Sequence, residues 1–107
     1  MKKQDRRKTN GNSHAACAVR VEFNDPNATE VAIAGTFNNW RPEVTRMIPL
    51  GCGRWLKELM LPPGTYEYLF VADGKWLPDP WAEKSVRNPF GGVNSLMTVT
   101  NGDATDT

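Results

Sequence analysis

Short stretches of alternating apolar and polar residues, each ended by Gly, Pro, Asn or Asp, recur along this sequence. In the stretch AVRVEFN, which runs from residue 18 to 24, apolar Val19, Val21 and Phe23 alternate with polar residues. Successive side chains of a strand point to opposite faces, so this pattern is typical of one half-buried strand. No segment of useful length repeats its apolar residues with a helical period. The sequence therefore predicts an all-β protein.

The other predicted strands are equally short and lie between turns. They cover residues 30–37, 44–50, 54–61, 65–74, 75–77 and 94–100. A single sheet would leave one face of aromatic side chains in water, so two packed sheets are expected. We therefore predict one immunoglobulin-like β-sandwich of about seven short antiparallel strands over residues 16–100. Residues 78–92 are expected to form a long irregular arm, and arms of this length are usually functional or disordered.

The charge of the chain is concentrated at its start. Five of the 13 Lys and Arg residues lie before residue 9, where Asp5 is the only acid, and the net charge is +1. We expect residues 1–15 to be a disordered basic leader, with weak contact to an anionic surface as the alternative, and residues 101–107 to be a polar tail. The remainder is mildly acidic, and no apolar run of about 18 residues occurs. We therefore expect no nucleic-acid partner, no membrane partner and a cytoplasmic location.

Cysteine and histidine are too sparse for a disulfide framework or a metal site. Cys17 opens a predicted strand and Cys52 lies in a glycine turn, so a reduced pair is expected. The only histidine, His14, lies in the leader, and the chain has no Cys-X-X-Cys motif. We expect no metal and no cofactor.

Four tryptophans occupy different contexts. Trp55 lies within the leucine-rich strand at residues 54–61 and is predicted to be in the core. Trp40 follows two asparagines in the stretch GTFNNWRP, and Trp76 follows an Asp-Gly turn. Either these two rings close an end of the sandwich or they are displayed at the surface. Trp81, between a proline and an alanine, is expected to anchor the arm, with a third displayed ring as the alternative.

Displayed indoles suit sugars as ligands. A pyranose ring has an apolar face of C–H groups, which a flat indole can cover, and a rim of hydroxyls for polar groups. Aromatic walls with a few placed polar groups are typical of pockets for small polar ligands. We consider Asn38, Asn39, Lys75 and Asn94 as the polar groups near the two indoles.

The ordered motifs FNNW, PPGTYEYLFVADGKW, DP and GGVN resemble a known family. They are similar to the glycogen-binding module of the AMP-activated protein kinase β subunit, in carbohydrate-binding module family 48. That family also includes the N-terminal domains of isoamylases and glycogen-branching enzymes. The resemblance covers residues 19–99 and implies an immunoglobulin-like sandwich that binds α-1,4-linked glucose polymers. It also favours display of Trp40 and Trp76 over a role in closing the sandwich.

The resemblance assigns site residues position by position. The two stacking tryptophans of the family fall on Trp40 and Trp76, and its ligand-contacting asparagine falls on Asn94. An apolar residue that packs against the sugar chain falls on Phe90.

Two positions depart from the family pattern. Kinase-type members carry a sugar-contacting lysine where this chain has Leu69, and often a threonine where it has Gly92. Weaker binding or a different glucan preference is therefore expected, although Lys75 in the next turn could supply the lost ammonium group. Asn39 completes the set of candidate carbohydrate-binding residues.

Catalysis is not expected from this sequence. Glycoside hydrolysis uses two carboxylates, and Asp73, Asp79 and Glu83 lie near the expected site. However, Asp73 begins a turn and Asp79 precedes a proline, so both have structural roles, and a small sandwich face offers little to bury a distorted sugar. We predict a non-enzymatic module that binds an α-glucan polysaccharide or maltooligosaccharide. The alternative is a protein-interaction module that packs on a separate glucan-metabolising enzyme or kinase chain.

Overall fold

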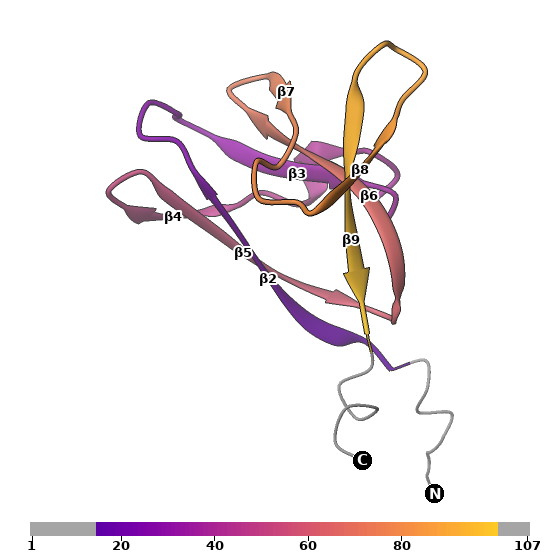
Figure 1. Ribbon diagram of the computed structural model, residues 1–107. Helices are drawn as coiled ribbons and strands as arrows, with labels where there is room; N and C mark the ends of the chain where they lie inside the picture. Colours follow the sequence, from indigo (N-terminus) through magenta and orange to yellow (C-terminus); the bar gives the residue numbers. More distant parts are fainter. Residues whose placement is uncertain (1–14, 101–107) are drawn as a thin grey trace, which may run out of the picture.

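The computed structural model describes residues 15–100, which form two antiparallel β-sheets (Figure 1). All but one of the residues of the expected leader, and all of the expected tail, lie outside this range. The elements of the described part are β2 (Cys17–Asn24), β3 (Val31–Gly35), the 3-10 helix η3 (Pro42–Val44), β4 (Ile48–Gly51), β5 (Arg54–Leu61), β6 (Gly64–Ala72), β7 (Lys75–Leu77), β8 (Lys84–Arg87) and β9 (Val93–Val99). The predicted all-β sandwich is confirmed. Within residues 15–100 no helix is long and apolar enough to cross a membrane.

Strand pairing divides the elements into a small and a large sheet. The small sheet has the order β2-β5-β4, and the large sheet has the order β3-β6-β9-β8. The edge of β6 opposite β3 pairs with β9 in its first half and with β7 in its second half. The segment between η3 and β4 continues the large sheet beyond β3, because Ala32 bridges Arg46. The large sheet is therefore wide enough to carry a binding surface.

The core lies between the two sheets and comes from the inward positions of their strands. Phe23 of the small sheet packs against Phe70 of the large sheet, with ring centroids 4.5 Å apart. Trp55 is 7% exposed, and its indole N–H donates a hydrogen bond to the carbonyl of Asp25. The core placement predicted for Trp55 is therefore confirmed. Both described cysteines, Cys17 and Cys52, are free.

The arm expected at residues 78–92 is not irregular throughout. Lys84–Arg87 form β8, which pairs with β9 from Lys84 opposite Leu96 to Arg87 opposite Val93. The prediction missed this strand because four residues are too few to show a clear alternation. The strand matters for function, since it turns the second half of the arm into a hairpin with β9. The loop of that hairpin and the β6–β7 hairpin project at the same end of the molecule in Figure 1.

The outer face of the large sheet carries the residues that concern function. Along β6, Tyr68, Phe70 and Ala72 are buried toward the core, so Leu69 and Val71 point outward. Ser95 of β9 pairs with Tyr68 of β6, so the next position in this antiparallel register places Asn94 opposite Leu69.

Candidate functional site

A groove of about 520 Å³ is lined by residues of the β6–β7 and β8–β9 hairpins and by Trp40, and we call it the aromatic groove. Five predicted site residues line it together: Trp40, Leu69, Trp76, Phe90 and Asn94. The other lining residues are Pro78, Asn88, Pro89, Gly92 and Val93. None of the described residues that line it has an ionisable side chain. The groove therefore offers apolar surface and amide groups to a ligand, and no charge.

Trp40 reaches the groove from a strained turn. Trp40 has a φ of 60° and Asn39 a φ of 58°, so both adopt the left-handed conformation. This conformation is uncommon for residues other than glycine and is unusual for a bulky side chain. Such strain persists only where surrounding contacts hold it, and it clusters at functional sites.

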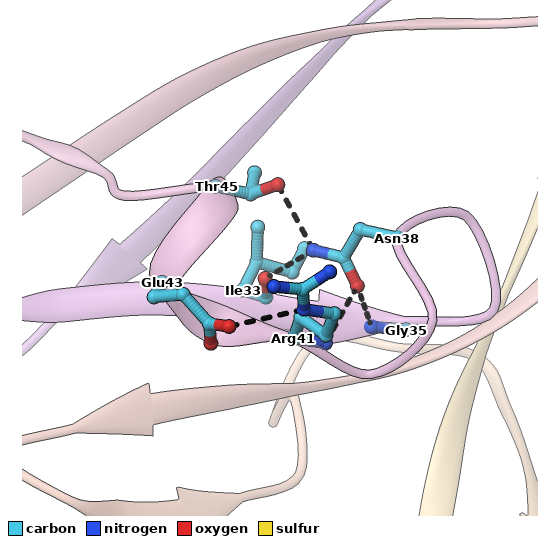
Figure 2. A network of polar contacts seen from close by, with 6 residues as sticks. All are labelled: Ile33, Gly35, Asn38, Arg41, Glu43 and Thr45. Carbon is cyan, nitrogen blue, oxygen red and sulfur yellow. Dashed lines mark hydrogen bonds and ion pairs between the residues drawn. The ribbon is translucent and has the colours of Figure 1, made fainter.

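Asn38 supplies those contacts (Figure 2). Its side-chain Oδ1 accepts hydrogen bonds from the backbone N–H groups of Gly35 and Arg41. Its Nδ2 donates to the carbonyl of Ile33 and to Oγ1 of Thr45. The amide thus ties the end of β3 to both sides of the turn. Asn38 was considered as a possible polar group for the sugar, but its amide is used to shape the turn that carries Trp40.

Trp76 enters the groove from β7, whose position depends on the turn at Asp73. Trp76 pairs with Val71, so its side chain lies on the outer face of the sheet, and it is 46% exposed. The Asp73 carboxylate accepts hydrogen bonds from the backbone N–H groups of Thr29 and Glu30. These two bonds, with a smaller contribution from the charge of Lys75, lower the pKa of Asp73. Asp73 therefore has a structural role, as its place in an Asp-Gly turn predicted.

Phe90 is presented by the loop between β8 and β9. Its side chain is 93% exposed, although a phenyl ring is strongly apolar. Asn88 closes this loop: its Oδ1 accepts hydrogen bonds from the backbone N–H groups of Phe90 and Gly92, and its backbone N–H donates to the Gly92 carbonyl. A ring held in water by a closed loop is available to a ligand.

Asn94 lies at the floor of the groove and is largely buried. Its Oδ1 accepts a hydrogen bond of 3.1 Å from Nδ2 of Asn88, and its Nδ2 donates one of 3.0 Å to Oε1 of Glu67. These partners fix the orientation of the amide. One N–H of Nδ2 and one lone pair of Oδ1 have no partner among the described residues and can serve a ligand.

Two predicted site residues are not brought into the groove. Asn39 and Lys75 are exposed but do not line it. Lys75 pairs with Ala72, whose side chain is buried, and therefore points away from the face that carries Trp76. Trp81 is 67% exposed and lies outside the groove, so the prediction that its ring anchors the arm is wrong. The backbone of this segment is held instead, because the Trp81 N–H donates to Oδ1 of Asp79.

Sequence reasoning missed Asn88, which contacts both Phe90 and Asn94. The available signal was the Asn-Pro pair at residues 88–89, which is typical of the start of a turn. Its role could not be read from the sequence without β8, since β8 brings Asn88 next to β9.

The second carboxylate considered for catalysis also has a structural role. Oδ2 of Asp79 accepts a hydrogen bond from the Tyr68 hydroxyl, and the Asp79 N–H donates to Oγ of Ser95. Burial, together with the bond to Asp79 and its charge, raises the pKa of Tyr68. Asp79 thereby joins the arm to β6 and β9, and neither Asp79 nor Glu83 lines the groove.

Comparison with known proteins gives a consistent picture. Residues 17–105 match the family model described as the glycogen recognition site of AMP-activated protein kinase. The human 5'-AMP-activated protein kinase subunit beta-2 is 38% identical over 76 residues, covering 69% of this chain and 26% of that protein. The rice protein FLOURY ENDOSPERM 6, chloroplastic (Oryza sativa subsp. japonica) is 37% identical over 82 residues, covering 77% of this chain and 15% of that protein.

The fold has a counterpart among solved structures. A crystal structure of a maltogenic amylase from S. marinus superposes with a TM-score of 0.63 at 22% identity, covering 78% of this chain and 14% of that one. At this identity the likeness concerns the fold alone. The chain spans about a quarter of the length of the kinase subunit and less of the other two proteins.

Proposed function

This chain belongs to the family of the glycogen recognition site of AMP-activated protein kinase, and from that premise we propose that it binds α-1,4-linked glucan in the aromatic groove without catalysis. Trp40 and Trp76 stack on sugar rings, and Phe90 packs against the chain. Asn94 exchanges hydrogen bonds with hydroxyl groups. Neither Asn39 nor Lys75 is part of this proposal, since neither lines the groove.

One observation carries the proposal: five candidate residues, from five different strands and loops, meet in one uncharged groove. Indole and phenyl rings cover the apolar face of a pyranose, and the amide of Asn94 suits its hydroxyls. A neutral polyol gains nothing from ionic contacts, so the lack of charge in the described lining fits it better than an anionic ligand. The strain at Trp40 supports the same reading, because the turn holds this ring at an energetic cost.

The affinity for a short oligosaccharide is expected to be modest. Each stacked ring contributes roughly 0.5–1.5 kcal/mol beyond its buried area, and each net hydrogen bond roughly 0.5–1.5 kcal/mol. Association opposes this with about 4–15 kcal/mol of lost freedom. Leu69 and Gly92 supply no side-chain donor where kinase-type relatives have Lys and often Thr. We therefore expect a Kd on the order of micromolar to millimolar.

Calorimetric titration with maltoheptaose tests the proposal, with cellohexaose as the control for linkage. The wild-type protein should bind the α-linked sugar and not the β-linked one. Trp76→Ala should abolish detectable binding, whereas Trp81→Ala should leave it unchanged, since that exposed indole lies outside the groove. Equal loss in both variants, or equal binding of both sugars, would refute the groove as an α-glucan site.

A protein-interaction role has its own support and is the second candidate. Ile48 and Met60 are 57% and 61% exposed on the outer face of the small sheet, away from the aromatic groove. Two binding assays separate the two functions: retention of the protein on immobilised glycogen, and its retention by a purified kinase or glucan-active enzyme. Loss of the protein contact alone in a Met60→Ser variant would assign it to the small sheet. The cytoplasmic location stays a prediction, since the rice relative is named as chloroplastic.

A further inference from the structure

A second groove, of about 400 Å³, lies beside the edge strand β3, and we call it the β3-edge groove. Ala32 and Val71 line it from the outer face of the large sheet, and buried core residues such as Trp55 also line it. Pro42, Glu43 and Arg46, from η3 and the segment that follows, form another part. This groove has no role in the binding described above.

The strand register joins the two grooves. Val71 of β6 pairs with Trp76 of β7 on one side and with Ala32 of β3 on the other. Ala32 in turn bridges Arg46. Directly paired residues point to the same face of a sheet, so the four side chains form one row across it. At about 4.8 Å per strand the row is roughly 14 Å long, and it begins at a wall of the aromatic groove.

The chemistry along this row suits a sugar chain. Ala32 and Val71 give a low aliphatic floor for the C–H face of a pyranose. Arg46 is exposed and has no ion pair among residues 15–100, so its guanidinium donors are available to hydroxyl oxygens. Glu43 is paired with Arg41 through Oε2 only, which leaves Oε1 as an acceptor. A hydrogen bond from its own backbone N–H and the one from Arg41 lower the pKa of Glu43, so it stays ionised at neutral pH.

We propose that a linear glucan continues past Trp76 over Val71 and Ala32 into the β3-edge groove, where Arg46 and Glu43 bind the hydroxyls of a few further glucose units. This inference rests on the proposed function of the aromatic groove and adds a second subsite to it. It makes the protein selective for linear chains long enough to occupy both grooves. A closed ring can occupy only the aromatic groove.

The test compares three ligands: β-cyclodextrin, maltohexaose and maltodecaose. A longer chain also binds a single site more tightly, because it can bind there in more positions. The quantity to compare between variants is therefore the affinity for maltodecaose divided by the affinity for maltohexaose. Arg46→Ala removes the guanidinium donors, and Ala32→Leu places a larger side chain on the floor between the grooves. Each should lower this ratio by about 2- to 10-fold, the equivalent of one net hydrogen bond. Their affinity for β-cyclodextrin should stay unchanged. Arg20→Ala, an exposed arginine on the small sheet, is the matched control and should keep the wild-type ratio.

The two proposals fail in different ways. If wild-type protein binds β-cyclodextrin and both variants keep the wild-type ratio, the β3-edge subsite is refuted and the aromatic groove stands. If wild-type protein binds none of the three ligands, the proposed function itself is refuted, and the subsite with it. Loss of β-cyclodextrin binding in Arg46→Ala, with an unchanged circular dichroism spectrum, would also overturn the subsite, because it would place Arg46 in the first groove.

Discussion

Trp55 and Trp76 differ in what surrounds their rings. Trp55 is 7% exposed between the sheets, and its N–H is bonded to a backbone carbonyl. Trp76 is 46% exposed on the outer face, in a groove that no described residue fills. The same side chain therefore stabilises the fold at one position and is available to a ligand at the other.

Replacement of each tryptophan by alanine should separate these roles. Trp55→Ala should lower the free energy of unfolding by about 3–5 kcal/mol, as expected for emptying a large core position. Trp76→Ala should change it by less than about 1 kcal/mol, since surface changes are usually small. Urea denaturation measures both. A larger loss in Trp76→Ala than in Trp55→Ala would contradict the assignment.

Leu69 offers a gain-of-binding test at the floor of the aromatic groove. If a lysine at this position donates to a sugar hydroxyl, Leu69→Lys should strengthen maltoheptaose binding. A charged hydrogen bond contributes about 1.5–3 kcal/mol and ordering a lysine opposes up to about 2, so a gain of about 1 kcal/mol is expected. Salt should barely change it, because the glucan is neutral. Unchanged or weaker binding by a folded variant would show that this position does not serve the sugar.

At the scale of single elements, the turn between β3 and η3 depends on one amide. Asn38→Ala removes four hydrogen bonds that hold Trp40 in place, at about 0.5–1.5 kcal/mol each. We expect a loss of at least about 2 kcal/mol in stability and weaker glucan binding. Asn38→Asp keeps the acceptor and loses the donor, so its effects should be intermediate. Thermal unfolding and maltoheptaose titration would check both, and wild-type binding by a folded Asn38→Ala would show that the turn does not position Trp40.

The turn between β6 and β7 gives a pH-dependent prediction. Hydrogen bonds from the backbone N–H groups of Thr29 and Glu30, just before β3, lower the pKa of Asp73, so its contribution to stability is present above about pH 4 and is lost as the pH falls through the lowered pKa. Asp73→Asn should therefore lower Tm at pH 7 and lower it less at pH 2. Equal shifts at both pH values would mean that the charge of Asp73 is not what stabilises the turn.

The elements show what the sequence could and could not predict. Alternation in the longer strands predicted β2, β5 and β6. The four residues of β8 are too few for such a pattern, so the segment was interpreted as irregular. The contact of Asn88 with Asn94 of β9 depends on that missed pairing. The positive φ of Trp40 could not be foreseen either, because the hydrogen bonds of Asn38 that shape this turn join Ile33 to Thr45 and leave no mark in the residue pattern.

At the scale of the whole molecule, the sandwich places its core and its candidate site on opposite faces of one sheet. Residue patterns alone left open whether Trp40 and Trp76 close an end of the sandwich or face a ligand. The family resemblance favoured display, and both residues line the aromatic groove together with Phe90. The fold was thus predictable from local patterns, whereas the groove required the arrangement of segments up to about 50 residues apart.

The proposed function requires that Trp40 and Trp76 contact the glucan in the aromatic groove, whereas Trp55 and Trp81 lie outside that groove. The indole N–H signals of the four tryptophans, assigned by single Trp→Phe variants, can be followed by NMR during a β-cyclodextrin titration. The signals of Trp40 and Trp76 should shift together along one saturation curve, and those of Trp55 and Trp81 should stay in place. A saturating shift of Trp81, or of none of the four, would contradict the account.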